Sequence, residues 1–85
     1  MYYFYVLESI SKDYLYYGST SDLSKRLLYH NEKKVKSTKY NAPYKILYFE
    51  KYNTLSEARK REFNIKKNWA AKADLKKKIF GSTTA

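Results

Sequence analysis

The chain has 85 residues, no cysteine, and 18 lysines and arginines against 8 acidic residues, for a net charge of +10. This length supports one domain with one small core. The lack of cysteine and of a zinc-finger spacing of histidine excludes a disulfide or zinc scaffold. The charge favours a polyanionic partner, nucleic acid first. Membrane-surface binders and merely soluble proteins carry similar charge, so it indicates a partner and not a reaction.

No apolar run approaches the roughly 20 residues of a membrane span. The opening "MYYFYVLES" has neither the basic start nor the cleavage site of a secretion signal. We therefore expect a cytoplasmic protein without a membrane segment. Eleven tyrosines predict a core in which phenol rings pack while their hydroxyls stay available for hydrogen bonds or chemistry.

Residues 2–8 form an alternating aromatic and β-branched run, which predicts a strand buried on both faces, with Tyr3, Tyr5 and Leu7 on one face. The polar "SISKD" follows, and "YLYYG" resumes the strand pattern. We expect an antiparallel hairpin with a loop of about four or five residues, whose second strand ends at Gly18.

A helix is expected from about residue 22 to 33, with Ser21 as its N-cap and Asp22 in the first turn. The polar, basic segment 32–43 ends in the only proline and predicts a surface loop. Residues 44–52 then read as a third strand, with Tyr44, Ile46 and Tyr48 on one face.

The segment after Asn53 or Thr54, either of which is a suitable cap, is expected to be helical to about residue 68. Apolar residues recur at helical spacing over 70–80, and residues 81–85 are expected to be a disordered tail. The order strand, strand, helix, strand, helix, helix predicts an α+β fold. We expect one domain over residues 1–80, with a three-stranded, mainly antiparallel sheet flanked by about three helices.

Helical phase makes Glu62 conspicuous. With Leu55 at zero, Ala58 falls at about 300° and Glu62 at about 340°, within the apolar arc, whereas Glu57 points to water at about 200°. A carboxylate on such a stripe needs a cation, a metal or hydrogen-bond donors to offset its desolvation. A structural ion pair with a lysine or arginine at the core edge is the alternative to a functional role.

The earlier helix places two polar residues beside its leucines. With Leu23 at zero, Arg26 falls at about 300° and His30 at about 340°, so we expect both to face one cleft. The alternative is an arginine that reaches to the surface and a histidine that is satisfied at the core boundary. Tyr5 and Tyr16 lie on neighbouring strands of the hairpin, and either is compatible with a plain core position.

Together these residues resemble the GIY-YIG nuclease superfamily, and most closely its small stand-alone members, which look like the N-terminal catalytic domain of the bacterial excision-repair nuclease, the excinuclease. The triplets are "YFY" at 3–5 and "YYG" at 16–18, which keep the tyrosines and Gly18 but not the isoleucines. The continuation "GSTSDLSKRLLYHN" carries the signature arginine at Arg26 and the frequent histidine at His30. "KSTK", "PYKILYFE" and "SEARKREFNIKK" extend the resemblance, with the signature glutamate at Glu62.

The resemblance implies a DNA endonuclease that uses one divalent ion, Mg²⁺ or Mn²⁺, held by Glu62. It further implies that Tyr16 activates the attacking water, that Tyr5 orders the site, and that Arg26 binds the phosphate. His30 either assists Tyr16 or contacts phosphate, and both roles stay open. No nucleotide cofactor is expected.

The other lysines are interpreted as binding the phosphates of the DNA backbone, which predicts weak sequence preference. The alternative for any one lysine is a solvated surface position. The nucleic-acid-binding candidates are Lys34, Lys36, Lys39, Lys66 and Lys67, followed by Lys72, Lys76, Lys77 and Lys78. Branched or damaged DNA and a protein partner are both compatible with so small a chain, and DNA repair or processing is the expected setting. Two other hypotheses stay open: a nucleic-acid-binding module that does not cut, and a protein-interaction module.

Overall fold

The computed structural model describes residues 1–81. Three strands and three α-helices follow one another in the order β-β-α-β-α-α. They are β1 (Tyr2–Ser9), β2 (Leu15–Thr20), α1 (Leu23–Asn31), β3 (Tyr44–Tyr52), α2 (Leu55–Lys67) and α3 (Trp69–Phe80), with a short 3-10 helix, η1 (Lys39–Asn41), in the loop before β3.

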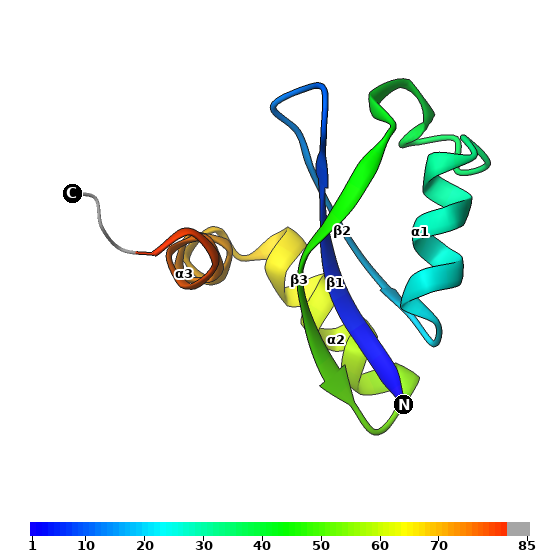
Figure 1. The fold of residues 1–85 in the computed structure, drawn as a ribbon. Helices are drawn as coiled ribbons and strands as arrows, with labels where there is room; N and C mark the ends of the chain where they lie inside the picture. Colours follow the sequence, from blue (N-terminus) through cyan, green and yellow to red (C-terminus); the bar gives the residue numbers. More distant parts are fainter. Residues whose placement is uncertain (82–85) are drawn as a thin grey trace.

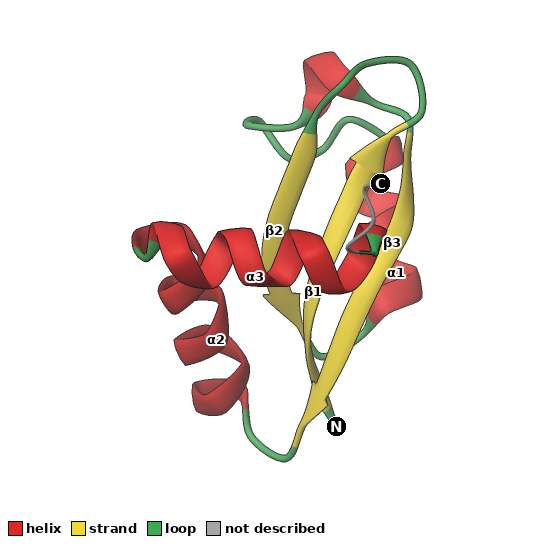
Figure 2. Ribbon diagram, turned by 90° about the vertical axis from the view of Figure 1, so that its left-hand side faces the viewer, coloured by secondary structure: helices red, strands yellow, loops and turns green. Residues whose placement is uncertain are grey.

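The sheet has the order β2-β1-β3 and is antiparallel throughout. One face is covered by α1, and the other by α2 and α3 (Figure 1). Figure 2 shows α3 crossing the sheet and α2 lying near the β2 edge, with α1 behind the strands. The predicted fold class and element order are confirmed. No helix in the described part of the chain is long and apolar enough to cross a membrane.

The central strand β1 supplies the core of both layers because its side chains alternate between the two faces. Phe4 and Val6 join a cluster with the buried residues of α2 and α3, while Tyr5 and Leu7 pack toward α1 with Tyr44. The burial of β1 on both faces is therefore confirmed.

The predicted face of β3 is correct for two residues and wrong for the third. Tyr44 and Ile46 pack on the α1 side, but Tyr48 packs on the α2 side. The register with β1 shifts between Val6 and Leu7, so that one residue of β3 is extra at this point. Such a bulge reverses the facing of every later side chain, which period-two reasoning cannot foresee.

The second strand continues to Thr20 instead of ending at Gly18, so the predicted end of this strand is wrong. Gly18 is paired with Tyr5 across the β1–β2 ladder. A Cβ atom at Gly18 would lie 2.5 Å from the Tyr5 hydroxyl oxygen. Glycine is required here because the phenol ring lies against the backbone of the neighbouring strand, and not because the chain turns.

Helix α1 is shorter than predicted, and its N-cap is Asp22 instead of Ser21. The Asp22 carboxylate accepts the backbone N–H of Lys25 at 3.0 Å, from an extended backbone conformation. This is ordinary N-cap geometry, and a carboxylate there also complements the helix dipole. Lys33, with φ of 61°, lies outside the helix at its other end.

Helix α2 begins with a capping box, in which Thr54 and Glu57 each accept the other's backbone N–H. The N-cap is therefore Thr54, one of the two residues predicted for this position. Asn68 separates α2 from α3 and caps the latter through the N–H of Ala71. Gly81 follows α3. The rest of the predicted tail, residues 82–85, lies outside the described residues.

A polar clamp fixes α2 on β3. The Glu50 carboxylate accepts two bonds from Arg61, at 2.9 and 3.1 Å, and one each from the hydroxyls of Tyr48 and Tyr52. Paired bonds of this kind are geometrically specific. The clamp therefore joins α2 to an edge strand of the sheet, β3.

Candidate active site

The Tyr5 hydroxyl is the meeting point of two residues from α1. Arg26 donates its Nε–H to the hydroxyl at 3.3 Å, and His30 Nε2 lies 3.1 Å from it. Tyr5 and His30 are almost fully buried, at 1% and 0% exposure. Arg26 and His30 converge as expected, but they meet at this buried oxygen and not in an open cleft, because His30 is fully buried.

The other nitrogen of His30 is held by a residue that sequence reasoning did not select. Thr38, from the loop before η1, lies 2.8 Å from His30 Nδ1 and donates its own hydroxyl to the Val35 carbonyl at 3.3 Å. Thr38 therefore accepts from Nδ1–H, which leaves Nε2 to accept the Tyr5 proton. This assignment, made from the hydrogen-bond pattern, gives His30 as the neutral Nδ1–H tautomer.

The charge states agree with that pattern. Burial, together with the nearby positive charge of Arg26, lowers the pKa of His30 to about 4. Burial raises the pKa of Tyr5 to about 12, although Arg26 acts in the opposite direction. At neutral pH the chain of hydrogen bonds therefore joins a cation, a neutral phenol and a neutral imidazole.

Tyr16 lies beside this network on β2. Its ring centroid is 5.0 Å from that of His30 and 6.4 Å from that of Tyr5. The hydrogen bond with Tyr5 is the main cause that raises the pKa of Arg26, and Tyr16 adds to it. Unlike Tyr5, Tyr16 is only partly buried, so it connects the interior network with the surface.

Glu62 reaches the same sheet edge from α2. Its Oε1 accepts the Ser19 hydroxyl at 2.7 Å, and its Oε2 accepts from Lys66 Nζ at 2.7 Å. Lys66 Nζ also lies 5.5 Å from the centre of the Tyr16 ring. β2 is an edge strand, so side chains from α1 and α2 meet around it. The structure thus brings Tyr5, Tyr16, Arg26, His30 and Glu62 to one edge.

Comparison with known proteins shows the family of the chain. The model of the GIY-YIG catalytic domain matches residues 1–77. The chain belongs to the GIY-YIG nuclease superfamily. Two UPF0213 proteins, from Streptococcus pyogenes serotypes M3 and M1, are each 44% identical to it over 66 residues, covering 76% of this chain and 71% of the relative. No solved structure gives a significant match.

Arg26, at this sheet edge, has no anionic partner among the described residues. Arg26 is partly buried, yet within residues 1–81 it forms no ion pair; its hydrogen-bond partner is the neutral Tyr5 hydroxyl. A desolvated cation without a counterion is costly. The site is therefore electrostatically suited to an anion that comes from outside.

The donor set at this edge is compatible with a hydrated hard cation. The described residues contain no group of three or more histidine or acidic side chains that would form an all-protein metal cage. Mg²⁺ commonly binds through one or two carboxylates and keeps water and substrate oxygens as its other ligands. Glu62, whose side chain is 22% exposed, fits that mode once Lys66 releases its Oε2.

The first five predicted lysines occupy two regions, and the other four lie on α3. Lys66 is at the site, and Lys67 stands over the Phe63 ring on α2. Lys34 pairs with Glu32 and lies over the Tyr29 ring, and Lys39 lies over Tyr40. Lys34 and Lys39, like the exposed Lys36, belong to the segment between α1 and β3. Within residues 1–81, Lys34 pairs with Glu32 and not with a carboxylate of the site.

Ser19 and Thr38 are the site residues that sequence reasoning missed. Ser19 directly follows Gly18, in a segment whose sequence is typical of a turn, which gives no reason to expect it opposite α2. Thr38 lies in "KSTK", a segment noted for its family resemblance, yet a threonine in a basic loop carries no sign that its hydroxyl faces a histidine eight residues earlier. Both depend on contacts between distant segments.

Proposed function

We propose that the chain is a metal-dependent DNA endonuclease that hydrolyses phosphodiester bonds with weak sequence preference, in DNA repair or processing in the cytoplasm. The observation that carries this proposal is the Arg26 guanidinium, unpaired by any carboxylate of residues 1–81, at the sheet edge that also bears Glu62. Hydrolysis of a phosphodiester requires a positive group that binds the phosphate and a ligand that holds the metal. Arg26, which lacks a counterion, suits the first role, and the Glu62 carboxylate suits the second.

Arg26 is proposed to bind the scissile phosphate. Guanidinium groups match phosphate oxygens in charge and geometry, and their interaction strengthens as negative charge develops in the transition state. The hydrogen bond to Tyr5 holds the guanidinium in place before substrate arrives. The lowered pKa of His30 keeps that residue uncharged at neutral pH, so Arg26 remains the positive group of the network.

Glu62 is proposed to hold the divalent ion, Mg²⁺ or Mn²⁺. When bound, the ion polarises the phosphate and offsets its developing charge. The Ser19 hydroxyl orients one carboxylate oxygen of Glu62, and Lys66 is paired with the other. When the metal takes the place of Lys66, the ammonium can turn toward a backbone phosphate of the DNA. In the absence of metal, the ion pair with Lys66 offsets the desolvation of Glu62. This is the structural ion pair that the sequence offered as the alternative to a functional role.

Tyr16 is proposed to take the proton from the attacking water. Its partial exposure gives it access to solvent, and the adjacent positive charge of Arg26 stabilises a developing phenolate. Tyr5 is the less suitable base, because its pKa is raised to about 12 and its proton is directed at His30. Tyr5 and His30 are therefore proposed to position Arg26 and Tyr16. His30 is fully buried, which argues against direct phosphate contact.

A plasmid-nicking assay tests the proposal. The wild-type protein should nick in Mg²⁺ or Mn²⁺ and not in EDTA, and Glu62→Ala, Tyr16→Phe and Arg26→Ala should each lose most activity while keeping the wild-type circular dichroism spectrum. Loss for Glu62→Ala should exceed about 1000-fold, as removal of several kcal/mol of transition-state stabilisation implies. Glu57→Gln is the matched control, because Glu57 lies on the same helix but serves its capping box.

No cleavage of duplex, single-stranded, branched or damaged DNA in either metal would overturn the proposal. Equal cutting by Glu62→Ala and wild type would overturn it as well.

A non-cutting nucleic-acid-binding module is the second candidate, and the Lys66–Glu62 ion pair favours it because the carboxylate is already occupied. In that case binding is salt-sensitive, needs no metal and survives Glu62→Ala. The same protein would leave every DNA intact.

A further inference from the structure

The outer face of α2 carries an exposed aromatic ring among cations. Phe63 is 64% exposed. Arg59 and Lys60 precede it by one helical turn, and Lys67 follows by one turn with its ammonium 5.8 Å from the ring centre. Residues at this spacing share one side of a helix. The ring is open to a ligand, because most of it lies outside the core.

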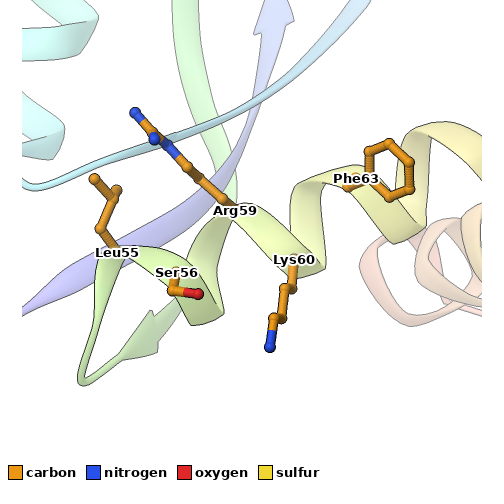
Figure 3. Close-up of a pocket in the computed structure, with 5 residues that line it drawn as sticks. All are labelled: Leu55, Ser56, Arg59, Lys60 and Phe63. Carbon is orange, nitrogen blue, oxygen red and sulfur yellow. The ribbon is translucent and has the colours of Figure 1, made fainter.

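Two shallow hollows meet at this ring. The larger, of about 500 Å³, is lined by Leu55, Ser56, Arg59, Lys60 and Phe63, and Figure 3 shows Arg59 and Lys60 projecting in different directions from α2 with the Phe63 ring one turn further on. The second, of about 340 Å³, is lined by Arg59, Glu62, Phe63 and Lys66. Because Arg59 and Phe63 line both, the two hollows form one trough, which begins at Glu62.

The trough keeps a net positive charge, because Glu62, which lines it, is paired with Lys66. Within residues 1–81, Arg59, Lys60 and Lys67 form no ion pair. Glu57, the other carboxylate of α2, is committed to the capping box on Thr54. The chemistry of the surface therefore favours a polyanion that also offers a flat apolar group.

We propose that this trough binds an unpaired stretch of the DNA strand next to the scissile phosphate, with Phe63 stacked on one exposed base. Arg59 and Lys60 hold the flanking phosphates. This inference rests on the proposed function in one respect, since Glu62 marks where the cut phosphate lies. A base inside a duplex is stacked on its neighbours and has no free face, whereas an unpaired base stacks readily on an aromatic side chain. The protein should thus prefer single-stranded or tailed DNA to blunt duplex.

Equilibrium binding in EDTA tests the proposal independently of cutting. Fluorescence anisotropy is measured with a labelled single strand, a duplex with a single-stranded tail and a blunt duplex of the same length. For the first two probes, Phe63→Ala should raise Kd about 10-fold, as loss of one base–aromatic stack predicts, and the blunt duplex should change less than about 2-fold. Phe63→Trp should retain binding. Arg59→Gln should reduce the slope of log Kd against log salt concentration by about one, the contribution of one phosphate contact.

Phe80→Ala is the matched control, because Phe80 is also an exposed phenylalanine beside lysines, on α3, at 54% exposure. It should bind all three probes as wild type does. The proposal is overturned if Phe63→Ala binds the tailed probe as tightly as wild type, or if it binds all three probes more weakly by the same factor. It is also overturned if the wild-type protein binds none of the probes, which is the result expected of a site for an acidic peptide. Failure to cut in Mg²⁺ with this binding pattern intact would refute the endonuclease proposal alone.

Discussion

Two polar networks lie on opposite faces of the sheet, and each contains one arginine. On the α2 side, Arg61 is paired with Glu50, which two tyrosine hydroxyls also reach. On the α1 side, Arg26 meets the Tyr5 hydroxyl and, through it, the neutral His30. The first network contains both signs of charge; the second, within the described residues, contains only a cation.

This difference separates a structural role from a functional one. A network that neutralises itself leaves no group for a ligand, and its value is to fix α2 on β3. A network with an uncompensated cation is suited to an anion from outside, because its other members stay neutral. Burial alone would raise the pKa of Glu50, but the hydrogen bonds from Arg61 and from the two tyrosine hydroxyls outweigh it, so the pKa is lowered. This agrees with a carboxylate whose charge is satisfied inside the protein.

The largest effect on stability is expected from breaking the charged network. Arg61→Gln should lower the free energy of unfolding by about 3–5 kcal/mol, because it leaves the Glu50 carboxylate, 16% exposed, without its cation. Urea denaturation at pH 7 measures this. A loss below about 1 kcal/mol would mean that the clamp is not what holds α2.

The neutral network should reveal itself through pH. Between the ordinary histidine pKa of 6.5 and the folded value of about 4, the unfolded chain binds a proton that the folded chain does not. Stability should therefore fall as the pH is lowered through this window, by about 3 kcal/mol in all.

Urea denaturation from pH 7 to 4 on wild type and His30→Gln isolates this contribution. Glu50 also loses stabilisation on acidification, but it does so in both proteins and cancels in the difference. Parallel pH profiles for the two proteins would contradict the neutral buried state of His30.

The smallest effect is expected from a single methyl group. In Gly18→Ala the new Cβ would meet the Tyr5 hydroxyl and ring, and Tyr5 would have to move away from Arg26 and His30. We expect a loss of stability of about 1–3 kcal/mol from overpacking and a nicking rate lower by about 10-fold, equivalent to about 1.4 kcal/mol. Gly81→Ala is the control: Gly81 has no neighbour within 4 Å, although its φ of 81° means that alanine there also costs some stability. It should nick normally, and an equal loss of nicking in Gly81→Ala would show that the effect of Gly18→Ala is not specific to the site.

The sequence was sufficient for the fold class and for the inward phase of Glu62, because helical periodicity reports which side of a helix faces the core. It was also sufficient to suggest that Arg26 and His30 act together. It could not show that β2 runs through Gly18 or that β3 reverses its facing at a bulge, since both are set by the partner strand. The contacts of Ser19 with Glu62 and of Thr38 with His30 join segments whose approach exists only in the folded chain.

The nicking rate of Arg26→Gln, measured in Mg²⁺ beside Arg61→Gln at a temperature where both are folded, tests the central claim most directly. Removal of the uncompensated cation should slow nicking by about 100- to 1000-fold, the loss typical of one charge-stabilising donor in a transition state, while the free energy of unfolding changes by less than about 1 kcal/mol. Arg61→Gln should show the opposite pattern, with stability reduced and nicking largely kept. Wild-type nicking by Arg26→Gln would contradict the assignment of this arginine to the phosphate.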